Sequence, residues 1–353
     1  ETARFFEDIH FRKKLSSESP DLYFGFYDEV IIFDHRKNSY HFAVQAENGK
    51  SAQEKLKNLK RFFKPVKRVK NSFQVSAFKP QISRKNFESM VRKARKYIEA
   101  GDIYQANLSQ RFSFKFKGPA APLYGALRRI NPSPFASFLK INSLSIISSS
   151  PERLVSKRGG VCETRPIAGT RPRKAGRDRS LEKELLASPK ERAEHIMLVD
   201  LERNDLGRVC DYRTVKVQEM MGIEKYSHVI HIVSKITGNL SKGSDGWDLM
   251  KAMFPGGTIT GCPKVRCMEI IDELEPVSRG LYTGSIGYFG FDGNLDFNII
   301  IRTLVLQKDQ GYFQVGAGIV YDSDPAKEYE ETLHKGEALV HAMAHANDLG
   351  DSL

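Results

Sequence analysis

Apolar positions recur along this chain with the period of a helix in three segments. From Ser83 to Gly101 they return every three or four residues, which predicts a helix over that span. Ser188-Pro189-Lys190-Glu191 has the form of a capping box with proline in the first turn, and predicts a helix to about Leu201. Asp324-Pro325 opens a third predicted helix, which continues to about Ala346.

Between these helices the chain is rich in β-branched and aromatic residues and is punctuated by turn residues, a pattern typical of strands. The predicted strand segments are 21–35, 103–116, 137–144, 145–160, 226–240, 284–291, 295–307 and 312–321. Strands in hairpin-like pairs, with helices inserted between groups, predict an α+β fold of stacked antiparallel sheets with outer helices.

Composition narrows the class of protein. A chain of 353 residues, 40% of them hydrophobic, can bury a large core, and one large mixed domain is as compatible with this length as two. No apolar run is long enough to span a membrane, so no membrane partner is expected. The first residues lack the features of a signal peptide, and the chain begins at Glu rather than Met, so we expect an upstream part of the natural chain to be missing.

The charge pattern leaves one alternative open. The net charge is +12, and a basic run at 55–70 lies within a segment, 50–80, that we interpret as a surface helix followed by a proline-containing linker. Such a run could bind nucleic acid, but no nucleic-acid-binding motif accompanies it, and a positive field would also attract a small dianion. Cys162, Cys210, Cys262 and Cys267 form no CxxC pair, which favours free thiols in a reducing cytoplasm.

Two glycine-rich stretches resemble nucleotide motifs without satisfying them. The GAG at 316–318 follows a strand pattern but is not followed by a helix, and GGTITGCPK (256–264) has Cys262 where a phosphate-binding loop requires lysine. We therefore do not predict dinucleotide or P-loop phosphate binding.

Acidic residues on two predicted helices point to a metal site. Glu328, Glu331 and Lys335 share one helix face, although Glu328 would also be explained by its favourable interaction with the helix dipole. Glu194 lies among apolar residues in the middle of another predicted helix, where burial is costly without a partner or a metal. Two glutamates from different helices could hold Mg²⁺ and leave positions for a carboxylate and water.

Three further residues are candidates on chemical grounds. Glu152 lies in SSSPERLV, His231 in SHVIHIV, and Arg302 at the end of the apolar segment NIIIR, where its planar fork would suit a carboxylate. A structural ion pair would explain Arg302 equally well, and a histidine within a strand is usually a core residue.

Seven stretches together resemble the chorismate-utilising enzymes, a family that includes anthranilate synthase component I, aminodeoxychorismate synthase component I and the isochorismate and salicylate synthases. The stretches are PIAGTRPR, VDLERNDLGRV, SHVIHIVS, GGTITGCPKVRCMEIIDELEP, RGLYTGSIGYF, DFNIIIRT and GAGIVYDSDPAKEYEET. The resemblance covers roughly 21–346 and implies an α/β sandwich, in which two large, mostly antiparallel sheets are stacked with helices outside and enclose the active site between them.

The resemblance also implies roles for individual residues. Glu194 and Glu331 correspond to direct Mg²⁺ ligands, and Glu328 to an outer carboxylate. The residues that correspond to binders of a chorismate carboxylate are Tyr282, Arg302, the backbone at Gly316 and Gly318, and Lys335.

The resemblance implies that a second group of residues takes part in the chemical step. Glu152 corresponds to the general acid that protonates the departing C4 hydroxyl, and His231 to the active-site histidine. Thr258, Thr170 and Gly169 correspond to residues around the substrate.

Ala168 occupies a decisive position in the family pattern, facing C2 of the substrate ring. Many aminodeoxychorismate synthases have a lysine there that attacks C2, whereas a methyl group supplies no lone pair. The sequence therefore disfavours isochorismate and salicylate synthesis and predicts ammonia as the nucleophile, giving 2-amino-2-deoxyisochorismate without a covalent link to the protein.

From that intermediate, loss of pyruvate would give anthranilate, and attack of a second ammonia at C4, with departure of the C2 amine, would give 4-amino-4-deoxychorismate. PIAGT is typical of anthranilate synthases, but GDIYQANLSQRF, TGSIGYF, LDFNIIIRT and NPSPFASFL favour the aminodeoxychorismate branch. We predict a Mg²⁺-dependent aminodeoxychorismate synthase component I, with anthranilate synthase as the alternative. Ammonia would come from a glutamine amidotransferase subunit, since no glutaminase cysteine motif is found here.

Overall fold

The computed structural model describes residues 2–13, 20–62, 73–173, 177–226 and 229–346. The chain divides into two compact units, one formed by residues 1–21 and 71–353 and the other by residues 22–70. The smaller unit contains the hairpin of β1 (Glu29–Asp34) and β2 (Ser39–Val44) and the helix α1 (Gly49–Lys60). Asn48 caps α1 by accepting a hydrogen bond from the Ser51 backbone N–H.

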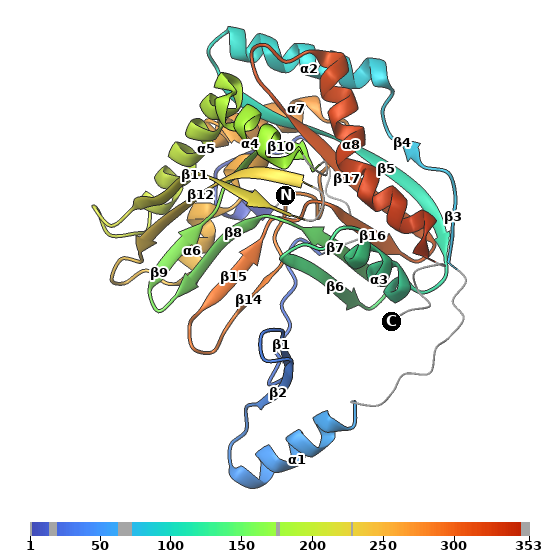
Figure 1. The fold of residues 1–353 in the computed structure, drawn as a ribbon, viewed down its shortest axis with the longest axis vertical. Helices are drawn as coiled ribbons and strands as arrows, with labels where there is room; N and C mark the ends of the chain where they lie inside the picture. Colours follow the sequence, from blue (N-terminus) through green and yellow to red (C-terminus); the bar gives the residue numbers. More distant parts are fainter. Residues whose placement is uncertain (1, 14–19, 63–72, 174–176, 227–228, 347–353) are drawn as a thin grey trace. The chain divides into compact units, whose positions relative to one another are not determined.

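Antiparallel strands and helices make up the larger unit (Figure 1). Its helices are η1 (Thr2–Phe5), α2 (Arg84–Glu99), α3 (Ala120–Ile130), α4 (Asp178–Ala187), α5 (Pro189–Gly207), α6 (Gly246–Met253), η2 (Gly257–Ile259), α7 (Lys264–Leu274) and α8 (Pro325–Ala344). Its strands are β3 (Gln74–Val75), β4 (Lys79–Pro80), β5 (Gln105–Lys117), β6 (Phe135–Ile141), β7 (Leu144–Ser150), β8 (Arg153–Arg158), β9 (Val161–Thr164), β10 (Ile167–Pro172), β11 (Lys216–Lys225), β12 (Val229–Asn239), β13 (Gly261–Cys262), β14 (Gly287–Phe289), β15 (Leu295–Asn298), β16 (Thr303–Gln307) and β17 (Gln310–Ile319).

The strands form two large sheets, which confirms the predicted fold class. One has seven strands in the order β10-β12-β9-β8-β15-β14, with β11 also paired to β12. The other has eight, in the order β13-β5-β17-β16-β7-β6, with β3 and β4 also paired to β5. The long pairing of β5 with β17 runs from Ala106 opposite Ile319 to Lys115 opposite Gln310.

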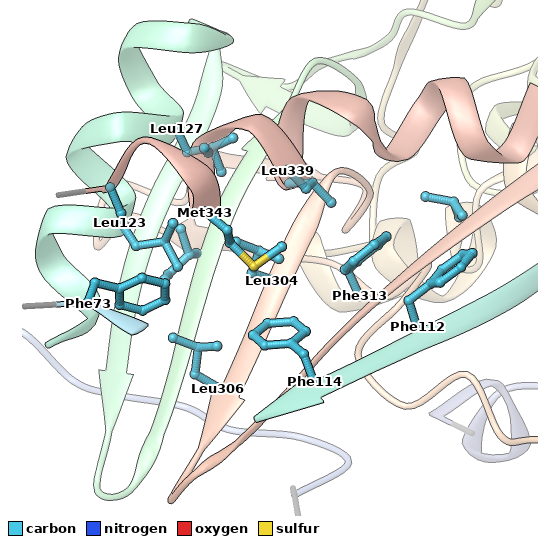
Figure 2. Close-up of a cluster of buried hydrophobic side chains, with 14 residues drawn as sticks. Phe73, Phe112, Phe114, Leu123, Leu127, Leu304, Leu306, Phe313, Leu339 and Met343 are labelled. Carbon is cyan, nitrogen blue, oxygen red and sulfur yellow. The ribbon is translucent and has the colours of Figure 1, made fainter. Parts of the chain in front are cut away.

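Each sheet is covered by its own helices. In Figure 1, α2 and α8 run along β5 and β17, and α4, α5 and α6 lie beside the seven-stranded sheet. A cluster of buried apolar side chains joins the eight-stranded sheet to α3 and α8; Figure 2 shows Phe114, Leu304 and Phe313 facing Leu123 and Leu339 in this layer. None of the helices within the described residues is long and apolar enough to cross a membrane.

Several predicted boundaries are confirmed. Helix α2 begins after Ser83, whose side chain accepts from the Asn86 N–H, and α5 begins after Ser188, whose side chain accepts from the Glu191 N–H. In the basic segment, α1 matches the predicted surface helix, while residues 63–72 of the expected linker lie outside the described residues. Ser227 and His228 of a predicted strand lie outside them too.

Other expectations were wrong. The apolar segment 295–307 is not one strand: it breaks after Asn298 and resumes at Thr303 in the other sheet, so Arg302 lies between two strands rather than at the end of one. Of the predicted strand 21–35, only Glu29–Asp34 pairs. The helices at 120–130, 178–187, 246–253 and 264–274 were not predicted, because short amphipathic segments resemble loops or strands. Three of them have no side-chain cap, whereas the helix at 246–253 begins with a capping box formed by Asp245 and Asp248.

Candidate active site

Glu152 lies on the segment that crosses from β7 in one sheet to β8 in the other. It is buried, and burial raises the pKa of its carboxyl to about 7, against opposing contributions from the nearby Thr258 hydroxyl and the Ile167 backbone. Neither Glu152 Oε1 nor Thr258 Oγ1 makes a well-formed hydrogen bond within the described part of the chain. Glu152 Oε1 and Thr258 Oγ1 are thus two polar atoms near each other without a well-formed hydrogen bond. With a pKa of about 7, Glu152 can carry a proton near neutral pH.

His231 and the PIAGT segment lie side by side because β10 pairs with β12. In this register Ala168 is opposite Ile232 and Thr170 opposite His231, with an irregularity at Gly169 between them. The His231 Nδ1 lies 3.3 Å from the Gly169 carbonyl oxygen, which can only accept, so Nδ1 carries the hydrogen and Nε2 the lone pair. Burial, with the charge of Arg302, lowers the pKa of His231 to about 4, so the ring is neutral at neutral pH.

Ala168 itself is buried, with 7% of its surface exposed. The adjacent Gly169 has φ +65°, and a Cβ there would lie 2.8 Å from Glu191 Oε2, so glycine is required on both counts. Glu191 forms an ion pair with Arg171, 3.1 Å from Oε1 to Nη1. The backbone around Ala168 is thus tightly constrained, and its methyl group brings no nucleophile.

The charge of Glu331 acts on two other carboxylates, one on its own helix and one on another. Burial raises the pKa of Glu194 on α5, and the negative charge of Glu331 on α8 raises it further. Burial and Glu331 likewise raise the pKa of Glu328. Gln105 Nε2 donates to Glu194 Oε1 at 2.9 Å, and Lys335 Nζ lies 2.8 Å from Glu331 Oε1.

This arrangement fits a hard divalent cation chemically. All three side chains offer oxygen donors, and a cation would relieve the repulsion through which Glu331 raises the pKa of Glu194 and of Glu328. Among the described residues no group of three His, Cys, Asp or Glu side chains is close enough together to hold a metal ion. Glu331 forms an ion pair with Lys335.

A second group of residues surrounds Gly316 on β17. A Cβ at Gly316 would lie 2.7 Å from Tyr282 Oη and 2.6 Å from Asn107 Oδ1, so only glycine lets these polar atoms approach the strand. Lys335 Nζ donates to the Gly316 carbonyl at 3.0 Å. Gly318, two residues along the strand, has Glu194 Oε1 3.5 Å from its own Cβ position, which links this group to the acidic one.

Lys335 and Arg302 both act on Glu152, and the charge of Lys335 also acts on Glu194. Arg302 has φ +50°, a strained conformation for a non-glycine residue, and its half-buried guanidinium interacts with the charge of Glu152. The structure therefore brings into one neighbourhood residues that are distant in the chain, drawn from both sheets and from α5 and α8. Thr258, in η2, joins them beside Glu152.

A family model described as chorismate binding enzyme matches residues 1–341 of the chain. The chain belongs to the chorismate binding enzymes. It is 45% identical over 350 residues to aminodeoxychorismate synthase component 1 of Bacillus subtilis (strain 168), covering 97% of this chain and 74% of that protein. It is 44% identical over 364 residues to anthranilate synthase component 1 of Aquifex aeolicus (strain VF5), covering 99% and 73%.

The fold agrees with that membership. Anthranilate synthase component I from Streptococcus pneumoniae TIGR4 has a solved structure that superimposes with a TM-score of 0.80 at 38% identity, covering 89% of this chain and 72% of that one. Family membership confirms the resemblance found in the sequence and leaves the nucleic-acid-binding alternative without support.

In this chorismate binding enzyme, several polar residues of the site were not predicted. Gln105, Asn107 and Arg279 contact the residues above, and Glu202 on α5 is a buried acid whose pKa is raised by burial and further by the charge of Glu152. Gln105 and Asn107 are two apart in GDIYQANLSQ, so they project from the same face of β5. Their alternation with apolar residues in this strand could have identified Gln105 and Asn107 as candidate site residues.

Proposed function

We propose that this chain is component 1 of an aminodeoxychorismate synthase. It would aminate chorismate with ammonia to give 4-amino-4-deoxychorismate, the precursor of 4-aminobenzoate in folate synthesis, through non-covalent 2-amino-2-deoxyisochorismate. The observation that carries the amination step is the buried methyl group of Ala168 on β10, held beside His231 by strand pairing. With no nucleophile from the protein at that position, ammonia itself must attack C2.

The acid–base chemistry rests on Glu152 and His231. Glu152, with a pKa of about 7, protonates the C4 hydroxyl so that it leaves as water instead of hydroxide. The added nitrogen must then lose a proton, and the neutral His231 ring offers a lone pair on Nε2 to accept it. Thr258 helps to orient the reacting part of the substrate next to Glu152.

Substrate binding follows from the charges. Chorismate is a dianion, and Arg302, Lys335, the Tyr282 hydroxyl and the backbone N–H groups near Gly316 and Gly318 supply donors for one carboxylate. Glu194 and Glu331, with Glu328 farther out, would hold Mg²⁺, which would screen and orient the other carboxylate. Gly169 and Thr170 would border the ring.

Ammonia would be delivered by a separate glutamine amidotransferase subunit. The designation of the Bacillus subtilis relative as component 1 supports a second component of this kind.

Anthranilate synthase component I is the second candidate, favoured by the Aquifex aeolicus relative and by the Streptococcus pneumoniae structure. It shares the first amination and differs in expelling pyruvate from the intermediate. The preference for 4-amino-4-deoxychorismate comes from GDIYQANLSQRF, TGSIGYF, LDFNIIIRT and NPSPFASFL.

Product analysis separates the two. The protein is incubated with chorismate, Mg²⁺ and an ammonium salt, with and without a lyase that converts 4-amino-4-deoxychorismate to 4-aminobenzoate. We expect 4-aminobenzoate only when the lyase is present. Fluorescent anthranilate formed without the lyase would refute the proposed product and establish the second candidate.

A further inference from the structure

The guanidinium of Arg279 engages all of its N–H groups with separate parts of the chain. Nε and Nη2 donate to the two carboxylate oxygens of Glu275 at 3.0 and 2.7 Å. Nη2 also donates to the Asn107 carbonyl at 2.6 Å. Nη1 donates to the Ile259 carbonyl at 2.7 Å and lies 3.5 Å from Thr283 Oγ1. Only 11% of the Arg279 side chain and 2% of the Glu275 side chain are exposed.

Glu275 extends this connection into the eight-stranded sheet. Its Oε1 accepts from both the backbone N–H and the hydroxyl of Ser109 on β5, at 2.8 and 2.7 Å. The Ser109 hydroxyl in turn accepts from Gln314 Nε2 on β17 at 2.7 Å. A buried ion pair is costly unless its hydrogen-bonding capacity is filled, and here it is filled by backbone groups of several segments.

The segments held in this way carry residues of the proposed substrate site. Ile259 follows Thr258, and Thr283 follows Tyr282, whose ring lies 5.6 Å from the Arg279 guanidinium carbon. Asn107 contributes the Oδ1 atom beside Gly316. Among the described residues this Oδ1 is buried without a hydrogen-bond partner, as expected for an atom that faces a ligand position.

Backbone strain at Thr283 indicates that the surrounding residues must hold this part of the proposed substrate site in place. Thr283 has φ +66°, in the left-handed region that a β-branched residue rarely adopts, and such strain persists only where the surroundings enforce it. The Thr283 N–H donates to the Ile300 carbonyl at 2.8 Å, and Arg279 lies against its hydroxyl.

We propose that Arg279, paired with Glu275, is a positioning residue for chorismate binding. It holds Tyr282, the Asn107 segment and the Thr258 loop in the arrangement that receives a substrate carboxylate, without touching the substrate itself. The inference rests on the proposed role of Tyr282 in carboxylate binding. Lysine cannot replace Arg279 in this task, because a single ammonium lacks the planar fork that reaches Glu275 and two carbonyls together.

The test is the equilibrium binding of chorismate to Arg279→Lys, measured by calorimetry with Mg²⁺ and without ammonia or glutamine, so that no amination occurs. We expect the dissociation constant to rise by about tenfold or more, since several charge-assisted hydrogen bonds are lost. Phe114→Leu is the matched control, because Phe114 lies in the cluster of Figure 2, far along β5, and its truncation lowers stability without altering the site.

A rise of threefold or more in Arg279→Lys, absent in Phe114→Leu at a comparable melting temperature, supports the positioning role; a smaller rise overturns it. Glu275→Gln retains the volume of the side chain and one oxygen, and serves as the test under the same criterion if Arg279→Lys does not fold. Chorismate binding precedes either product, so the formation of anthranilate would refute the proposed function and leave this result intact.

Discussion

Glu152 and Arg302 lie on two of the chain segments that cross between the sheets, and these two segments are hydrogen-bonded to each other. The Ile299 N–H donates to the Glu152 carbonyl at 3.1 Å, and the Ser149 N–H donates to the Arg302 carbonyl at 3.1 Å. The positive charge of Arg302 partly offsets the effect of burial on the pKa of Glu152. The backbones of the proposed general acid and of the proposed carboxylate-binding cation are thereby held relative to each other.

The pH dependence of the reaction should follow Glu152. Because the acid must be protonated and its pKa is about 7, kcat/KM for chorismate should fall as pH rises above about 7, by tenfold per pH unit. The measurement holds the concentration of free ammonia constant across pH. Glu152→Gln should lower kcat by about 10²–10⁴-fold and abolish this alkaline limb in the residual activity.

Glu163→Gln is a control for general effects of removing a carboxylate, since Glu163 pairs with Arg153 on β8. It should retain the wild-type pH profile. A wild-type profile that is flat between pH 6 and 9 would exclude Glu152 as the general acid.

Glu331 and its neighbour Glu330 provide a test of the metal site within one helix. Glu331 is a proposed Mg²⁺ ligand, whereas Glu330 forms an ion pair with Arg84, 2.7 Å from Oε1 to Nη1. Glu331→Gln should weaken Mg²⁺ binding by at least about 100-fold, since even residues that only support a metal ligand typically cost 10–100-fold. Glu330→Gln should bind Mg²⁺ within about threefold of wild type, a difference too small to represent loss of a ligand.

Calorimetric titration with Mg²⁺ in the presence of chorismate measures this difference independently of turnover. Full activity of EDTA-treated, metal-free enzyme would contradict the metal site as a whole. Equal losses in the two variants would argue that α8 had been disturbed generally.

Because residue 168 is alanine, we predict that no covalent bond forms between the protein and the substrate. Intact-protein mass spectrometry after incubation with chorismate and Mg²⁺ should show the unmodified mass, because a buried methyl group cannot attack C2. Ala168→Lys, which restores the lysine found in many aminodeoxychorismate synthases, is the variant in which an adduct is expected. A mass increase on the wild-type chain would show that another residue acts as nucleophile.

Most of the proposed site residues were inferred from the resemblance to the chorismate-utilising enzymes, whereas the fold class could be predicted from local patterns, because caps and alternating strands leave direct marks on the sequence. The break at Arg302 could not. Ile299, Ile300 and Ile301 continue the strand-like apolar pattern, and only the tertiary structure determines that the strand before them and the strand after them belong to different sheets. Arg279 escaped notice for a related reason: its partners Asn107, Ile259 and Glu275 are assembled by the fold, and no spacing in the sequence connects them.

Glu202 on α5 carries a proton in the folded protein according to its hydrogen bonds. Thr164 Oγ1 lies 2.6 Å from Glu202 Oε2 and 2.9 Å from the Leu154 carbonyl, and a hydroxyl has only one hydrogen. The carbonyl can only accept, so both contacts are satisfied when the carboxyl is protonated and donates to Thr164. Consistently, burial raises the pKa of Glu202 well above its usual value of 4.5, and the charges of Glu152 and Asp205 raise it further.

This protonated acid should make stability depend on pH. A carboxyl whose pKa is raised by folding contributes stability that is fully present below pH 4.5 and is lost as pH rises toward the folded-state pKa, at about 1.4 kcal/mol for each unit of the shift. Glu202→Gln keeps a donor for Thr164 and does not ionise. Its free energy of unfolding, measured with urea, should therefore match that of wild type near pH 4.5 and exceed it increasingly up to pH 8. Glu219→Gln, at an exposed position on β11, should show no such divergence. If Glu202→Gln is destabilised equally at both pH values, Glu202 is ionised in the native state and the hydrogen-bond assignment to Thr164 is wrong.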